Sequence, residues 1–176
     1  MPTPRGDAGR RRYGAGVIRP ARPADVPTLV ELVRALATYE QAADEVRLDE
    51  PALERALFVM PAHAAAHVAE VGGTVVGMAI WFRTFSTWTG RHGIWLEDLF
   101  VQPDHRRRGL GRALVAALAA QARAEGAARL DWAVLDGNEP ARQFYAALGA
   151  TTLEAWRINR VAGDPLDRLA HEAAGA

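Results

Sequence analysis

Residues 93–126 constrain the fold most, because a strand pattern, a glycine loop and a helix pattern follow one another there. The run "GIWLEDLFV" has the apolar and aromatic content of a strand, and Pro103 ends it because proline cannot donate to a sheet ladder. After the glycine loop, the apolar residues Leu110, Leu114, Ala117 and Leu118 recur at helical spacing. They predict a helix that ends at Gly126. A strand that leads directly into a helix predicts a mixed fold.

The rest of the chain changes between the same two periods. Strand patterns occupy residues 17–21, 65–71, 74–82, 128–136 and 151–161, and the glycine pair at 72 and 73 predicts a hairpin. Helix patterns occupy residues 23–37, 50–59 and 139–149, the last with Gly149 at its C-terminal end. This order predicts one α/β (α+β) domain, with a central mixed, largely antiparallel sheet flanked by helices.

Both ends of the 176-residue chain differ in composition from its middle. Residues 1–14 predict a disordered basic tail, because their Pro, Gly and Arg content cannot bury an apolar face. We expect residues 166–176 to form a second, frayed tail, which leaves residues 15–165 as the domain. No apolar run has the length of a membrane span and the first residues lack a signal-peptide core, so we expect a cytoplasmic protein without a membrane partner.

Composition excludes several kinds of chemistry. The 21 basic and 21 acidic residues balance, which argues against a nucleic-acid partner. The chain has no cysteine and no lysine, so a thiolate nucleophile, a Schiff base and a lysine-bearing phosphate loop are ruled out. His63 and His67 are four residues apart, but they lie in or beside a strand pattern and no carboxylate completes a ligand set. We expect no metal site.

The loop "HRRRGLGRAL" at residues 105–114 has the form of an anion site. A strand, a short glycine loop and a helix that begins at once direct backbone N–H groups toward a bound anion. Leu114 stands where a dinucleotide fingerprint needs its third glycine, and a Walker loop would need a lysine. Two interpretations remain from the residues alone: a pyrophosphate site, or a tight turn with solvated arginines.

Three segments together resemble the GNAT N-acetyltransferases, and within them the spermidine/spermine branch. They are "VIRPARPADVPTLVELVRALATYE", "WLEDLFVQPDHRRRGLG" and "NEPARQFYAALGA", and the resemblance runs from about Val17 to Arg160. It implies that acetyl-CoA is the cofactor and that the loop holds its pyrophosphate. It also implies a homodimer. The cofactor residues that it implies are Leu99, Phe100, Val101, Arg106, Arg107, Arg108, Gly109, Leu110, Gly111, Arg112, Asn138, Ala141 and Tyr145.

Acetyl transfer to an amine needs a base and an acid. An alkylamine with a pKa of about 10.4 is neutral in only about one molecule per thousand near neutral pH, a handicap of about 4 kcal/mol. The resemblance assigns Glu97 as the base, through water, and Tyr145 as the acid that protonates the leaving thiolate. Adjacent strand residues point to opposite faces, so Glu97 and Asp98 can line one cleft only if the strand is irregular there.

The same resemblance gives the amine site a set of aromatic and acidic residues. They are Tyr39, Glu40, Trp88, Glu97, Asp98, Glu154 and Trp156, a lining suited to a cation. Ser86, however, stands where the polyamine enzymes carry an aspartate. A short diamine, a polyamine, a thialysine-like amino acid or another small primary amine therefore remains open as the acceptor.

The resulting hypothesis is an acetyl-CoA-dependent N-acetyltransferase that acts by direct transfer in a ternary complex. Direct transfer is expected because neither cysteine nor lysine is present to carry the acetyl group. The alternatives are a non-catalytic acetyl-CoA-binding regulatory module, an acetyltransferase for an aminoglycoside or another amine, and an arginine-rich RNA-binding protein.

Overall fold

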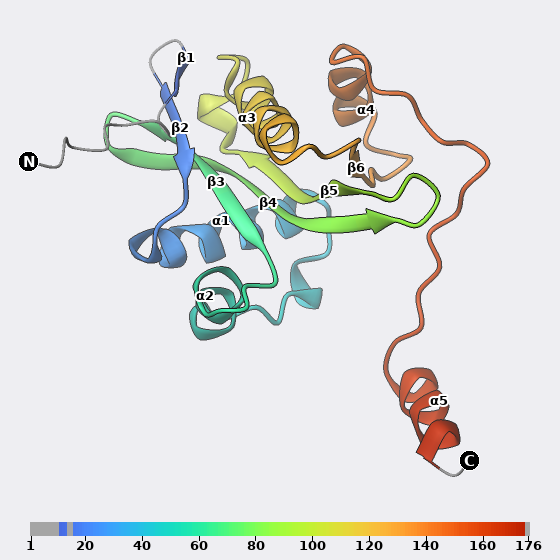
Figure 1. The fold of residues 1–176 in the computed structure, drawn as a ribbon. Helices are drawn as coiled ribbons and strands as arrows, with labels where there is room; N and C mark the ends of the chain where they lie inside the picture. Colours follow the sequence, from blue (N-terminus) through green and yellow to red (C-terminus); the bar gives the residue numbers. More distant parts are fainter. Residues whose placement is uncertain (1–10, 14–15, 175–176) are drawn as a thin grey trace, which may run out of the picture. The chain divides into compact units, whose positions relative to one another are not determined.

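A computed structural model of the chain describes residues 11–13 and 16–174 (Figure 1). Its contacts divide the chain into a first unit, Met1–Leu135, and a second unit, Asp136–Ala176, which are described separately below. No helix in the described ranges combines the length and the apolar character that a membrane span requires.

The first unit contains the sheet. Its strands lie in the order of the sequence: β1 (Arg11–Tyr13), β2 (Gly16–Pro20), β3 (Ala65–Val71), β4 (Thr74–Ser86), β5 (Arg91–Val101) and β6 (Leu130–Trp132). Neighbours from β1 to β5 are antiparallel, and β6 is parallel to β5. The predicted mixed, largely antiparallel sheet is confirmed.

Helices cover both faces of this sheet (Figure 1). On one face, α3 (Leu110–Glu125) buries Leu114 and Leu118 against β2, β3, β4 and β5. On the other face, α1 (Val26–Tyr39) and α2 (Glu50–Phe58) bury Leu29 and Leu53 against β3, β4 and β5. Short 3₁₀ turns occupy Pro23–Asp25, Ala43–Glu45 and Pro103–His105.

Local sequence signals account for several boundaries. Gly72 and Gly73 both have positive φ, 57° and 85°, so they form the predicted turn between β3 and β4. Gly109 and Gly126 have left-handed backbone angles at the two ends of α3. The end of the helix at Gly126 agrees with the prediction from the sequence.

A buried ion network holds the start of α1 on the sheet. The guanidinium of Arg19 in β2 donates two hydrogen bonds to Asp25, at 2.7 and 2.9 Å, and one to Glu70 in β3, at 2.7 Å. The Arg19 contact is the largest of the effects that lower the pKa of the Asp25 carboxyl. The orientation of α1 relative to the sheet is therefore set by hydrogen-bonded charges as well as by apolar packing.

The second unit consists of α4 (Glu139–Ala146), an extended segment, and α5 (Asp164–Ala174). The strand predicted at residues 151–161 is wrong, because the segment belongs to no strand and is exposed throughout. The described part of the tail expected at residues 166–176 is helical and lies in α5. None of residues 136–173 is buried, so this unit has no core of its own.

At the other end of the chain, most of the tail predicted at residues 1–14 lies outside the described residues. Residues 11–13 are described, and they pair with β2 as strand β1 instead of remaining disordered.

Candidate active site

The centre of the site is a break in the ladder between β4 and β5. Asp98 lies opposite Ile80 and Leu96 lies opposite Trp81, so Glu97 is an extra residue, a β-bulge. Leu96 packs in the cluster with α3, whereas Phe100, four residues later, packs in the cluster with α1 and α2. Regular alternation would put both on one face, so the bulge has reversed the alternation.

This reversal places both acidic residues on the α1 and α2 side. Glu97 alternates with Leu96 and so faces that side, and Asp98 faces it because it is two residues before Phe100. Glu97 and Asp98 were expected to line one cleft only if the strand is irregular between them, and the bulge is such an irregularity.

A third carboxylate approaches from the end of α1. Burial is the main cause that raises the pKa of Asp98 from 3.8 to about 6, and the negative charges of Glu97 and Glu40 add to it. Glu40 is the C-cap residue of α1. Three carboxyl groups gathered in this way form a site suited to a cationic amine, and the raised pKa of Asp98 is typical of a functional site.

Trp95 orients the carboxylate of Glu97. Its indole Nε1 donates to Glu97 Oε2 at 2.8 Å, from two residues earlier on the same face of β5. Sequence reasoning missed Trp95, although the spacing of two residues in a strand pattern was a signal that could have found it.

Beside the carboxylates, part of one edge of β5 has no strand partner among the described residues, and we call it the open edge of β5. The pairing with β6 covers only Ile94, Trp95 and Leu96 of β5. Beyond them, the expected cofactor residues Leu99, Phe100 and Val101 continue to pair with β4 on their other side. The backbone edge along residues 97–101 can therefore accept an extended ligand as an added strand.

The glycine loop connects this edge to α3. Gly109 is the N-cap of the helix with φ 80° and ψ 0°, and Arg107 also has a positive φ of 58°. A Cβ at Gly109 would meet no atom within 4 Å, so the glycine is needed for its backbone angle and not for want of space. Gly109 has no side chain to cap the first N–H groups of α3, which suits them to an anion.

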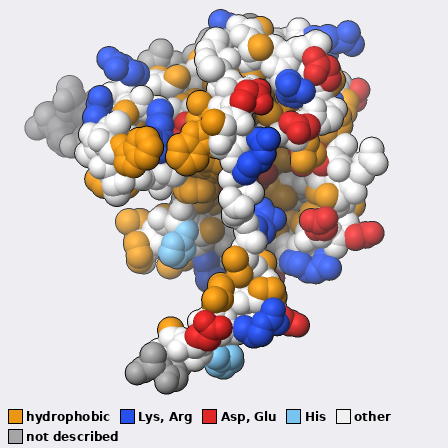
Figure 2. All heavy atoms as spheres, turned by 90° about the vertical axis from the view of Figure 1, so that its right-hand side faces the viewer, with side chains coloured by type: hydrophobic (Ala, Val, Ile, Leu, Met, Phe, Trp, Pro, Cys, Tyr) orange, Lys and Arg blue, Asp and Glu red, His pale blue; other side chains and the backbone are white. Residues whose placement is uncertain are grey.

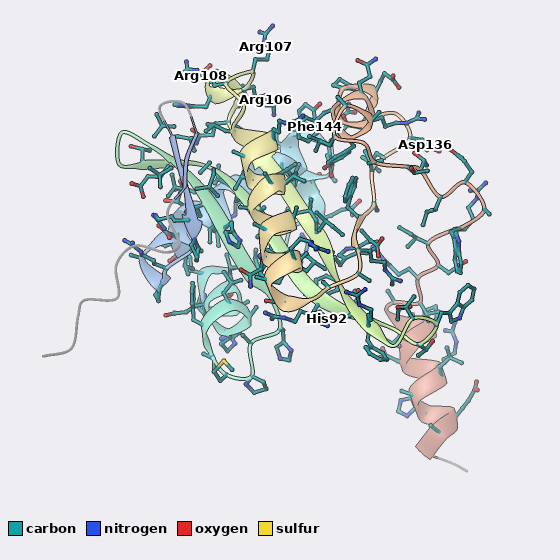
Figure 3. All side chains as sticks on the ribbon, turned by 45° about the horizontal axis from the view of Figure 1, so that its top comes forward. His92, Arg106, Arg107, Arg108, Asp136 and Phe144 are labelled. Atoms are coloured by element: carbon teal, nitrogen blue, oxygen red, sulfur yellow. The ribbon has the colours of Figure 1, made fainter. Side chains whose placement is uncertain are left out.

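The three arginines of the loop have different surroundings. Figure 3 shows them together at the N-terminal end of α3, with His92 near the opposite end of that helix. Arg107 and Arg108 are exposed. Arg106 is partly buried, and its Nε donates to the Val101 carbonyl at 2.9 Å. Its guanidinium lies 4.8 Å from the ring centroid of Tyr39 and 5.4 Å from that of Phe100.

The other expected cofactor residues of the first unit lie in α3. Leu110 is buried in the core, whereas Gly111 and Arg112 belong to the first turn of the helix. Leu110 thus anchors the start of α3.

The remaining expected residues are distributed between the two units. Trp88 is 87% exposed and lies in the turn before β5. The first six residues of β5 separate this turn from Glu97. In the second unit, Asn138 is the N-cap of α4 and accepts from the N–H of Ala141 at 3.2 Å. Tyr145 is partly buried on α4, with its ring 5.1 Å from that of Phe144. Glu154 and Trp156 lie in the exposed segment before α5.

Comparison with known proteins identifies the family to which the chain belongs. The acetyltransferase (GNAT) family model matches residues 29–150. A thialysine N-epsilon-acetyltransferase from Bos taurus is 36% identical over an alignment of 165 residues, and this alignment covers 88% of this chain and 96% of that protein. Spermidine/spermine N(1)-acetyltransferase-like protein 1 from Homo sapiens is 27% identical over an alignment of the same length, and this alignment covers 88% of this chain and 24% of that protein.

A solved structure agrees with the fold. Integron cassette protein VCH_CASS6, from the mobile metagenome of V. cholerae, has a TM-score of 0.75 and 25% identity. The likeness covers 89% of this chain and 98% of that one. The expected family resemblance and fold are both confirmed.

Proposed function

Because this chain belongs to the GNAT family and is an N-acetyltransferase, we propose that it moves an acetyl group from acetyl-CoA to the terminal amine of a small thialysine-like or diamine acceptor. The observation that carries the proposal is the bulge at Glu97, which puts two carboxyl groups beside the open edge of β5. An amine held by the carboxylates would lie next to a ligand that extends along that edge.

The residues present fit acetyl-CoA. Residues 97–101 offer backbone groups for its extended arm, and the loop at Gly109 with the N-terminus of α3 offers N–H groups for its pyrophosphate. Exposed Arg107 and Arg108 add positive charge there. When bound, acetyl-CoA supplies the acetyl group as a reactive thioester.

Two side chains move protons in this proposal. Glu97 takes a proton from the ammonium of the acceptor, through water, so that a neutral nitrogen can attack. Tyr145 would donate a proton to the departing thiolate. A thiol pKa of about 8.5 lies about 1.5 units below that of tyrosine, so this transfer would be uphill by only about 2 kcal/mol. Asp98 and Glu40 hold the positively charged acceptor, and Tyr39 offers its ring to the same cation.

The acceptor class rests on two observations. The Bos taurus thialysine enzyme matches more closely than the human spermidine/spermine-like protein over the same number of residues, 36% against 27%. Ser86 also lacks the carboxylate that would pair with a distant ammonium of a polyamine. We therefore place a thialysine-like amino acid or short diamine ahead of spermidine.

Assembly as a cytoplasmic homodimer belongs to the same proposal. It is supported by the second unit, where six large apolar side chains are more than half exposed: Leu153, Trp156, Ile158, Val161, Leu166 and Leu169. Figure 2 shows hydrophobic side chains on the surface of α5 among charged ones. A second copy would cover this surface, and light scattering during size-exclusion chromatography should give twice the 19.0 kDa chain mass.

Release of the free CoA thiol tests the function. The panel is thialysine, a short diamine, spermidine and an aminoglycoside, each with acetyl-CoA. We expect thialysine or the diamine to react, and spermidine to exceed neither by more than about tenfold, the scale of one weak ion pair. Acetyl-CoA binding without turnover on any amine would favour the regulatory module, and turnover on the aminoglycoside alone would change the acceptor class.

A further inference from the structure

We propose that Arg106 is a positioning residue of the amine site and not a ligand of the acetyl-CoA pyrophosphate. The inference rests on the proposed function for the identity of that site. It separates Arg106 from Arg107 and Arg108, the two residues that follow it, which share its charge and its loop but not its surroundings.

Three contacts direct the Arg106 side chain inward. Its Nε donates to the carbonyl of Val101, the last residue of β5. Its guanidinium lies over the rings of Tyr39, the last residue of α1, and Phe100 in β5. A planar, weakly hydrated guanidinium suits contact with two aromatic rings, and a lysine ammonium would be a poor substitute.

These contacts connect the end of α1 to the strand that carries the acidic residues. Glu40 follows Tyr39 directly, and its negative charge adds to burial and to the charge of Glu97 in raising the pKa of Asp98. Any movement of Tyr39 away from β5 would carry Glu40 with it. Arg106 thus sets the position of the Tyr39–Glu40 pair relative to Asp98.

A guanidinium held against two aromatic rings is less available to a phosphate than an exposed one. Arg107 and Arg108 are exposed in the same loop and carry the same charge, so they are the arginines available to an anion. The pyrophosphate is then held by backbone N–H groups of the loop and α3 with these two side chains.

The test compares Arg106→Gln with Arg108→Gln, which removes the same charge from the same loop. We expect Arg106→Gln to raise the KM of the amine by about fivefold or more, the scale of lost cation–π contacts, with a smaller change in the acetyl-CoA KM. Arg108→Gln should raise the acetyl-CoA KM and leave the amine KM within about twofold. The opposite pattern for Arg106→Gln would overturn the proposal.

A double-mutant cycle with Tyr39→Leu tests whether Arg106 acts through the ring. If it does, Arg106→Gln should add little to the loss in kcat/KM for the amine already caused by Tyr39→Leu. The cycle of Tyr39→Leu with Arg108→Gln should be additive. Additive losses in both cycles would show that Arg106 does not act through Tyr39.

Hydrogen exchange of the protein alone gives a readout that needs no substrate. Amides at residues 39–42 should exchange faster in Arg106→Gln than in the parent, and Arg108→Gln should match the parent. Unchanged exchange in Arg106→Gln would overturn the positioning role even if the enzyme accepts none of the amines tested. Faster exchange in a protein without amine turnover would instead count against the proposed function alone.

Discussion

The indole Nε1 of Trp95 donates to Oε2 of Glu97 at 2.8 Å, within a strand that is interrupted at Glu97 itself. A bulged residue is less constrained by the ladder than its neighbours, so a hydrogen bond to its side chain has more influence on where that side chain points. Trp95 therefore determines which way the proposed base faces.

Replacement of the base should have a pH signature. Glu97→Gln should reduce kcat/KM for the amine most near neutral pH, and the loss should shrink as pH approaches the amine pKa, where more acceptor arrives neutral. The pH–rate profiles of parent and variant on one amine measure this. An equal loss at every pH would mean that Glu97 attracts or positions the substrate without acting as the base.

Asp98 should make the protein less stable as pH rises. Its pKa is raised from 3.8 to about 6, so the folded state binds a proton that the unfolded chain has released between those values. The free energy of unfolding should fall as pH rises from about 4 to 6 and then level. Asp98→Asn should remove this fall and leave the protein up to about 3 kcal/mol more stable than the parent above pH 6.

Denaturant unfolding at a series of pH values measures the Asp98 effect. Asp104→Asn is the matched control, because Asp104 is an exposed aspartate in the turn that follows β5. The control should keep the pH dependence of the parent. The free energy of unfolding of the parent minus that of Asp98→Asn should fall between pH 4 and 6. A difference that stays flat or rises over this range would contradict the prediction.

Tyr145→Phe tests the proposed acid, because it keeps the ring and removes only the hydroxyl. We expect kcat to fall by about 10- to 1000-fold with a modest change in acetyl-CoA affinity, the range for loss of a general acid. Single-turnover rates measure the chemical step directly. A rate within twofold of the parent would make Tyr145 a packing residue on α4 and leave solvent to protonate the thiolate.

Gly109 and Gly126 form a matched pair at the two ends of α3. Both have positive φ, 80° and 74°, and a Cβ at either would meet nothing within 4 Å. Alanine at either position should therefore cost about 1–2 kcal/mol of stability through the backbone alone. Only Gly109→Ala should also weaken acetyl-CoA binding, by about tenfold or more in calorimetry. Equal binding by the two variants would remove the loop from the cofactor site.

Much of the fold follows from local signals in the sequence. The glycine pair between β3 and β4 and the glycines that bound α3 need backbone angles that few other residues adopt, so these elements were predicted closely. The helix α5 was missed although Asp164 and Pro165 are a helix-start signal, with Leu166 and Leu169 at helical spacing. The strand predicted at residues 151–161 has β-rich residues, but a strand also needs a partner, which sequence pattern does not supply.

In the candidate site too, some features follow from the local sequence and others depend on contacts between distant segments. The glycine loop and the acidic pair could be found from spacing and resemblance. The role of Arg106 could not, because three identical arginines in a row give no sign of which one turns inward. The bulge was also out of reach, since it is a relation between β5 and β4 and not a property of "LEDLF" alone.

Glu97 is surplus to the architecture of β5. If it were deleted, Asp98 would follow Leu96 in an unbroken ladder, and Leu99, Phe100 and Val101 would keep the faces that they now occupy. A chain shortened by this one residue should therefore fold with the same core. Redesign of β5 for a more regular sheet would therefore keep the core and discard the residue proposed to begin the chemistry.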